Sequence, residues 1–187
     1  MLTLLRLVLI PLFVFVYYLP YPHAAKIATA IFIAAGLTDW LDGYLARKLE
    51  QYSSFGAFLD PVADKLMVAA ALMMLIADTE VHKQVIDSRL FGIVALIIMG
   101  REIAVSALRE WMAEVGKRSR VAVSYIGKFQ TGSQMFAIGF LIWREPVAGI
   151  PTFRIGEYLL YIAAALTLWS MIAYLRAAWP NLTAPPQ

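Results

Sequence analysis

Long apolar stretches alternate with short polar ones along the whole of this 187-residue chain. A helix needs about 20 apolar residues to cross the hydrocarbon core of a bilayer. Runs of that order occur near residues 4–20, 24–48, 55–78, 90–112, 124–143 and 155–178. The pattern predicts an all-α integral membrane protein with six transmembrane helices.

The polar segments between these runs are short, and neither a repeat period nor a low-complexity linker is visible. We therefore predict one membrane domain over residues 1–179, followed by a disordered Pro-rich tail over residues 180–187. The first run lacks a small-residue cleavage site and is followed by further runs, so we interpret it as a retained helix rather than a signal peptide.

Composition and charge agree with this interpretation. Hydrophobic residues make up 61% of the chain and charged residues 16%, and the mean hydropathy of +0.69 exceeds that of ordinary soluble domains. Lys and Arg are more frequent in the segments that are cytoplasmic if both termini are cytoplasmic, as the positive-inside rule expects. The net charge of +3 does not argue for nucleic acid. The absence of cysteine excludes disulfides and thiolate chemistry.

Four aspartates interrupt the second and third apolar runs. Asp39 and Asp42 share one helical face by their spacing, and so do Asp60 and Asp64. If the two helices form an antiparallel hairpin about residues 51–52, Asp39 lies level with Asp64, and Asp42 with Asp60. An ionised Asp costs about 3 kcal/mol at the centre of a spanning helix, so four acids at matched depth indicate a functional site. We predict an active site between helices two and three, near the cytoplasmic face.

Carboxylates that converge in this way repel one another unless a cation lies between them. Without cysteine or a nearby histidine, carboxylates favour hard ions, so we predict Mg²⁺ or Mn²⁺. Four carboxylates are enough for two ions, and an ion pair suits displacement at phosphorus. Small residues complete the site, because Gly43 and Ala46 leave room for a ligand and Gly56 permits close helix approach.

The same stretch matches the pattern D-x2-D-G-x2-A-R-x8-G-x3-D-x3-D without a mismatch. The fixed positions are Asp39, Asp42, Gly43, Ala46, Arg47, Gly56, Asp60 and Asp64. In this pattern the chain resembles the CDP-alcohol phosphatidyltransferase family. The resemblance implies a six-helix, metal-dependent membrane transferase, usually a homodimer, that displaces CMP from a CDP-linked lipid with an alcohol.

The resemblance also implies a role for each matched residue. Asp39, Asp42 and Asp60 would be metal ligands, and Asp64 would be a metal ligand or the catalytic general base. Gly43 and Ala46 would lie against the cytidine. The residues expected to bind the CDP-lipid are Gly43, Ala46, Arg47 and Gly56.

Basic residues on later apolar runs indicate where the acceptor alcohol binds. A cluster of Arg101, Arg109 and Lys128 would hold a phosphate-bearing acceptor by charge-assisted hydrogen bonds. The alternative for each is a snorkelling side chain or a buried ion pair. Gln130 stands where a second basic residue is common in the family, so this turn offers one cation fewer.

Residues 101–131 and the opening LTLLRLVLIPLFV resemble bacterial family members that use sn-glycerol 3-phosphate as acceptor. This resemblance implies phosphatidyl transfer from CDP-diacylglycerol to sn-glycerol 3-phosphate in the bacterial cytoplasmic (inner) membrane, for phosphatidylglycerol biosynthesis. The chain begins at Met1-Leu2-Thr3, without the Asn-Ile-Pro segment that often precedes this opening, which leaves the role of Arg6 open.

Two alternatives remain at this point. The first is the same chemistry with another acceptor, such as inositol phosphate, serine or phosphatidylglycerol. The second is a divalent-cation transporter, because acids on paired helices also describe an ion path. No second tier of acids follows on later runs, which weighs against transport. Acceptor selectivity and metal uptake into vesicles distinguish the three functions.

Overall fold

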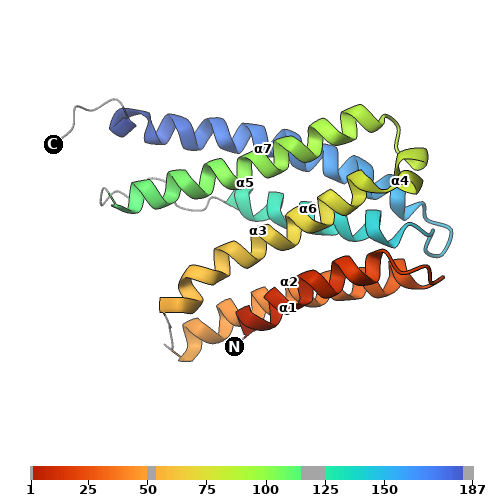
Figure 1. The fold of residues 1–187 in the computed structure, drawn as a ribbon. Helices are drawn as coiled ribbons and strands as arrows, with labels where there is room; N and C mark the ends of the chain where they lie inside the picture. Colours follow the sequence, from red (N-terminus) through yellow and green to blue (C-terminus); the bar gives the residue numbers. More distant parts are fainter. Residues whose placement is uncertain (1, 50–53, 115–124, 183–187) are drawn as a thin grey trace. The chain divides into compact units, whose positions relative to one another are not determined.

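The computed structural model describes residues 2–49, 54–114 and 125–182. Within these ranges the backbone forms seven helices and no strand. Six of them are long: α1 (Leu2–Tyr17), α2 (Ala24–Leu49), α3 (Ser54–Ala77), α5 (Ser88–Glu114), α6 (Tyr125–Trp143) and α7 (Thr152–Leu182). Each coincides with one of the predicted apolar runs, so the six predicted helices are confirmed as helices (Figure 1).

The structure differs from the prediction at the end of α1 and in the segment after α3. α1 ends at Tyr17, because Pro20 disfavours helical backbone at the residue before it. The polar segment after α3 contains a short helix, α4 (Thr79–Gln84), that was not predicted. Its N-cap is Asp78, whose side chain accepts a hydrogen bond from the backbone N–H of Glu80 at 2.8 Å. At six residues, α4 is too short to show a helical pattern.

The chain divides into two compact units. The first comprises residues 1–86 and 135–157, and the second comprises residues 87–134 and 158–187. The predicted single domain over residues 1–179 stays a prediction. We predicted a disordered tail over residues 180–187, but α7 continues through Leu182, and residues 183–187 lie outside the described residues.

In the first unit, α1 packs against both α2 and α3. Phe13 of α1 is fully buried, and its ring centroid lies 6.3 Å from that of Phe32 on α2. Close approach of α7 to α6 depends on Gly156, because a Cβ there would lie 2.9 Å from both the carbonyl oxygen of Ala137 and the Cβ of Phe140. Aromatic packing therefore joins α1 to α2, and the lack of a side chain at Gly156 lets α7 pack closely on α6.

Polar contacts gather four helix termini at one end of the first unit. Tyr17, at the end of α1, donates a hydrogen bond to Asp78 after α3 at 2.9 Å. Arg144, after α6, forms an ion pair with the same carboxylate. Lys26, near the start of α2, lies 2.8 Å from Glu145. The predicted topology places these termini on the non-cytoplasmic side, and this sidedness stays a prediction.

In the second unit, α5 and α7 share a buried apolar cluster of Val105, Met112 and Tyr174, against which Leu108 and Trp111 pack. Segments Ser88–Ala113 and Thr152–Arg176 are long and apolar enough to cross a membrane, whereas Leu4–Tyr17 and Ala24–Thr38 are shorter apolar helices. The structure thus supports a membrane protein, and the number of spans stays a prediction.

Candidate active site

The motif residues lie on two consecutive helices. Residues 39, 42, 43, 46 and 47 belong to α2, and residues 56, 60 and 64 belong to α3. α2 ends at Leu49, α3 begins at Ser54, and the two helices contact each other (Figure 1). The connection about residues 51–52 lies outside the described residues, so the predicted register of the hairpin stays a prediction. The side chain of Asp64 is described. The other motif side chains lie outside the described residues: Asp39, Asp42, Gly43, Ala46, Arg47, Gly56 and Asp60. Convergence of the four carboxylates therefore stays a prediction.

The chemistry of this hairpin fits a hard divalent cation. Its candidate donors are all carboxylates, and the chain contains no cysteine. Neither histidine belongs to the hairpin turn, since His23 precedes α2 and His82 lies on α4 at the far end of α3. Among the described side chains, no three acids or histidines are grouped so that they could hold a metal ion, and three of the four motif aspartates lie outside these side chains.

A residue of α1 joins this site. Arg6 Nη1 lies 2.5 Å from Asp64 Oδ1, in a charge-assisted hydrogen bond between helices 58 positions apart in sequence. The Arg6 side chain is 1% exposed, whereas that of Asp64 is 45% exposed. The guanidinium is thus fixed inside the protein and the carboxylate is accessible from outside. A cation at this position reduces repulsion among neighbouring acids.

The sequence left the role of Arg6 open, although it contains a signal for this residue. Arg6 is the one charged residue in the apolar run over residues 4–20. An ionisable residue in such a run is a functional-site hypothesis by default, with an acid as its expected partner. Which of the aspartates pairs with it cannot be derived from spacing, because α1 and α3 are not consecutive.

In the second unit, the structure places Arg101 and Arg109 on α5, eight residues apart. Arg101 is 6% exposed, and its Nη1 donates to Glu102 Oε1 at 2.8 Å. At Arg101 the structure therefore shows the ion pair that we predicted as the alternative to phosphate binding. Its Nε is buried without a hydrogen-bond partner among the described residues, so the same guanidinium retains a donor for another acceptor.

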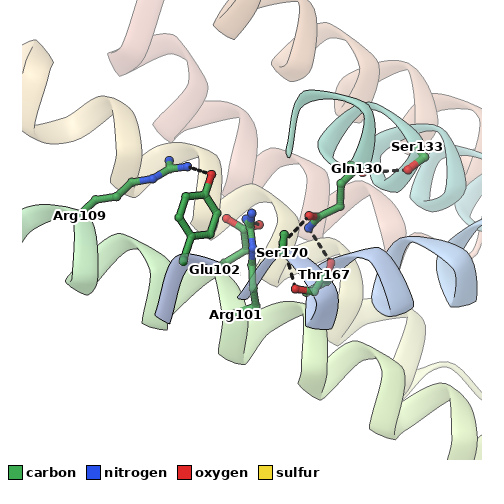
Figure 2. A network of polar contacts seen from close by, with 8 residues as sticks. Arg101, Glu102, Arg109, Gln130, Ser133, Thr167 and Ser170 are labelled. Carbon is green, nitrogen blue, oxygen red and sulfur yellow. Dashed lines mark hydrogen bonds and ion pairs between the residues drawn. The ribbon is translucent and has the colours of Figure 1, made fainter. Parts of the chain in front are cut away.

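Arg109 has a different partner, which the sequence did not indicate. Its Nη2 donates to the hydroxyl of Tyr174 on α7 at 2.9 Å, and its guanidinium carbon lies 5.2 Å from the centroid of that ring (Figure 2). Tyr174 is 7% exposed. The two residues are 65 positions apart, and no motif or spacing joins them.

Gln130 on α6 is fully buried and bonded to α7. Its Nε2 donates to Thr167 Oγ1 at 2.5 Å, and Ser170 Oγ lies 2.9 Å from its Oε1 (Figure 2). Both ends of the amide are therefore engaged within the protein. A lysine at this position would place a buried charge among neutral hydroxyl groups.

Lys128 belongs to α6, two residues before Gln130, and its side chain lies outside the described residues. The structure thus places the three predicted acceptor-binding cations on α5 and α6 of the second unit. Their convergence on one phosphate stays a prediction.

Comparisons with known proteins extend the motif to the whole chain. Residues 1–169 match the family model for CDP-alcohol phosphatidyltransferase. The chain is 52% identical over 185 residues to the CDP-diacylglycerol–glycerol-3-phosphate 3-phosphatidyltransferase of Haemophilus influenzae, covering 97% of this chain and 92% of that protein.

Proteins of the same name from other bacteria are similarly close. That of Pectobacterium atrosepticum is 50% identical over 187 residues, with coverage of 99% and 96%. That of Salmonella paratyphi A is 49% identical over 186 residues, with coverage of 97% and 94%. With its motif on α2 and α3, and with this similarity over nearly its full length, the chain belongs to the CDP-alcohol phosphatidyltransferase family.

Proposed function

We propose that this protein transfers the phosphatidyl group of CDP-diacylglycerol to sn-glycerol 3-phosphate, giving phosphatidylglycerophosphate and CMP. The observation that carries the proposal is the complete eight-position motif across the α2–α3 hairpin of a chain that is 52% identical to a protein named for this reaction. The basic residues on α5 and α6 support an acceptor that bears a phosphate.

The six long helices are proposed to span the bacterial cytoplasmic membrane, with both termini in the cytoplasm. Their lengths and the apolar character of α5 and α7 support this arrangement. It is also supported by the grouping of Tyr17, Asp78 and Arg144 at one end of the first unit. The α2–α3 connection would then lie near the cytoplasmic face, where a water-soluble acceptor arrives.

Mg²⁺ or Mn²⁺, with two ions at the site, is the proposed cofactor. Asp39, Asp42, Asp60 and Asp64 would hold the ions. When bound, the ions supply positive charge to the phosphate oxygens of the CDP-lipid and stabilise the charge that develops on the transferred and leaving groups. The all-carboxylate donor set of the hairpin supports this choice over zinc or copper.

In the proposed reaction, Gly43, Ala46, Arg47 and Gly56 bind the CDP-lipid. Arg101, Arg109 and Lys128 bind the phosphate of sn-glycerol 3-phosphate and direct its primary hydroxyl toward the phosphorus attached to diacylglycerol. The hydroxyl oxygen forms a new bond to that phosphorus, the bond to the CMP oxygen breaks, and CMP leaves. Asp64 accepts the hydroxyl proton.

The contact between Arg6 and Asp64 supports this assignment of roles. A proton acceptor must be held at a fixed place and must reach the substrate. Arg6 holds one oxygen of the carboxylate from inside the protein, while 45% of the Asp64 side chain remains exposed. Asp64 thus combines an anchored position with access to a ligand.

An acceptor panel tests the proposal. Purified protein in detergent is given CDP-diacylglycerol with Mg²⁺ or Mn²⁺ and one acceptor at a time: glycerol 3-phosphate, inositol phosphate, serine or phosphatidylglycerol. We expect CMP release with glycerol 3-phosphate, and loss of that release in Asp64→Asn. Turnover with a different acceptor alone would contradict the proposal that glycerol 3-phosphate is the acceptor. Metal uptake into vesicles without any CMP release would contradict transferase activity.

A homodimer, which the family resemblance implies, is tested by mass measurement of the detergent complex.

A further inference from the structure

A row of buried polar side chains runs along α7 in the second unit. Thr167, Ser170 and Tyr174 are spaced by three and four residues, so they share one face of the helix. Their exposed fractions are 0%, 4% and 7%. In a helix apolar enough to cross a bilayer, buried polar side chains mark a functional or a structural contact.

The members of this row have two kinds of partner. Thr167 and Ser170 bond to Gln130, a neutral residue, and so hold α6 to α7. Tyr174 bonds to Arg109, a cation that the proposed function places at the acceptor phosphate (Figure 2). Tyr174 is therefore the member of the row whose contact bears on substrate binding.

The ring of Tyr174 is held in place by its surroundings. It belongs to a buried apolar cluster with Val105 and Met112, and Leu108 and Trp111 pack against that cluster. Its hydroxyl is consequently a fixed acceptor for Arg109 Nη2 at 2.9 Å. A long arginine side chain that is already ordered loses less rotamer freedom when it binds a ligand.

This contact orients Arg109 and leaves other N–H donors of its guanidinium for a ligand. A guanidinium carries five N–H donors, and the Tyr174 hydroxyl accepts from one of them. The Nε of Arg109 is buried without a hydrogen-bond partner among the described residues. A buried donor of this kind is costly to leave unpaired, and a phosphate oxygen is a strong partner for it.

We propose that Tyr174 is a positioning residue for Arg109 and thereby sets the affinity for the phosphate-bearing acceptor. This inference rests on the proposed function, in which Arg109 binds the acceptor phosphate. Tyr174 touches no substrate itself and acts through the guanidinium. It lies beyond residue 169, where the match to the family model ends.

Three tyrosine variants of the full-length protein test this inference. Tyr174→Phe removes the hydroxyl and keeps the ring, whereas Tyr174→Leu removes both. Tyr158→Phe is the matched control, because Tyr158 lies on the same helix and is 54% exposed. Initial rates are measured in detergent–lipid micelles while glycerol 3-phosphate and CDP-diacylglycerol are varied independently. Melting temperature is measured on the same samples.

We expect Tyr174→Phe to raise the KM for glycerol 3-phosphate at least about tenfold, the effect of one hydrogen bond to a charged group. Its kcat and its KM for CDP-diacylglycerol should match those of Tyr158→Phe. Tyr174→Leu should raise the same KM further. In an Arg109→Ala background, Tyr174→Phe should have no additional effect, because the residue it positions is gone.

The outcomes separate this inference from the proposed function. If the unmodified protein uses glycerol 3-phosphate but Tyr174→Phe leaves its KM unchanged, the positioning role is overturned and the function stands. If both KM values rise together as the melting temperature falls, Tyr174 serves fold stability alone and the inference is also overturned. If the unmodified protein does not use glycerol 3-phosphate, the proposed function itself fails.

Discussion

Arg6 on α1 and Asp64 on α3 form an ion pair of 2.5 Å in which the cation is 1% exposed and the carboxylate is 45% exposed. The pair links the first helix of the chain to the last aspartate of the motif. An arginine held so far inside the protein needs its acid partner, because an unpaired buried charge is strongly destabilising. The acid remains open to a ligand. This asymmetry is what a positioned proton acceptor requires.

Removal of the cation should impair the reaction more than its conservative replacement does. We expect Arg6→Ala to lower kcat/KM at least about tenfold, because Asp64 loses the group that fixes its carboxylate. Arg6→Lys should retain part of the rate, since it keeps the charge but loses the planar donor geometry. Steady-state CMP release measures both, with the exposed Arg89→Ala as control. Equal rates for Arg6→Ala and the control would exclude a positioning role.

Stability should depend on pH through Asp78. Burial alone would raise the pKa of Asp78, but the hydrogen bond from Tyr17 and the charge of Arg144 outweigh it, so this pKa lies below its usual 3.8. A lowered pKa in the folded state means that the ionised carboxylate stabilises the fold at pH values above about 4 and loses this effect as the pH falls through the folded pKa.

At pH 7, Asp78→Asn should therefore melt at a lower temperature than the unmodified protein. We expect a loss of about 1–2 kcal/mol in the free energy of unfolding, a modest value because the pair is partly exposed. The difference should shrink as the pH is lowered toward 3. Thermal unfolding in detergent across this range measures it, with Glu110→Gln as an exposed control. A deficit that stays constant with pH would show that charge on Asp78 does not stabilise the fold.

Gly156 should not tolerate even a methyl group. An added Cβ would lie 2.9 Å from the carbonyl oxygen of Ala137 and from the Cβ of Phe140, so α6 and α7 would have to separate. We expect Gly156→Ala to lower the free energy of unfolding by about 1–3 kcal/mol. Gly139→Ala on α6 is the matched control, because its added Cβ meets nothing within 4 Å. If both variants melt at the same temperature, the close contact is not rigid.

The amide of Gln130 should matter for stability through its two bonded hydroxyl groups. Gln130→Leu leaves Thr167 and Ser170 without this partner in a buried site, and we expect a loss of about 1–3 kcal/mol of unfolding free energy. Adding Thr167→Val should recover part of that loss, since both members of the pair are then apolar. Thermal unfolding of the single and double variants measures the coupling. Strictly additive losses would argue against a direct bond.

The sequence was informative where the determining contacts are local. Apolar runs predicted the six long helices. Consecutive helices joined by a short connection predicted that α2 and α3 pack together, and the two helices are in contact. Each of these features depends on residues a few positions apart.

The missed features depend on distant or very short segments. The pairs Arg6–Asp64 and Arg109–Tyr174 are separated by 58 and 65 positions, and helical periodicity says nothing about which helices meet. α4 is one turn and a half of polar sequence that resembles a loop, although Asp78 is a recognisable N-cap. Tertiary contacts, rather than local propensity, decide these elements.

The central claim is phosphatidyl transfer to glycerol 3-phosphate, and product stoichiometry tests it most directly. Purified protein is incubated with CDP-diacylglycerol, Mg²⁺ and radiolabelled glycerol 3-phosphate, and both CMP and label in the organic-extractable lipid are counted. The account predicts one labelled lipid per CMP released, with neither product in Asp64→Asn. CMP release without label in lipid would contradict it, because water or another alcohol would then be the acceptor.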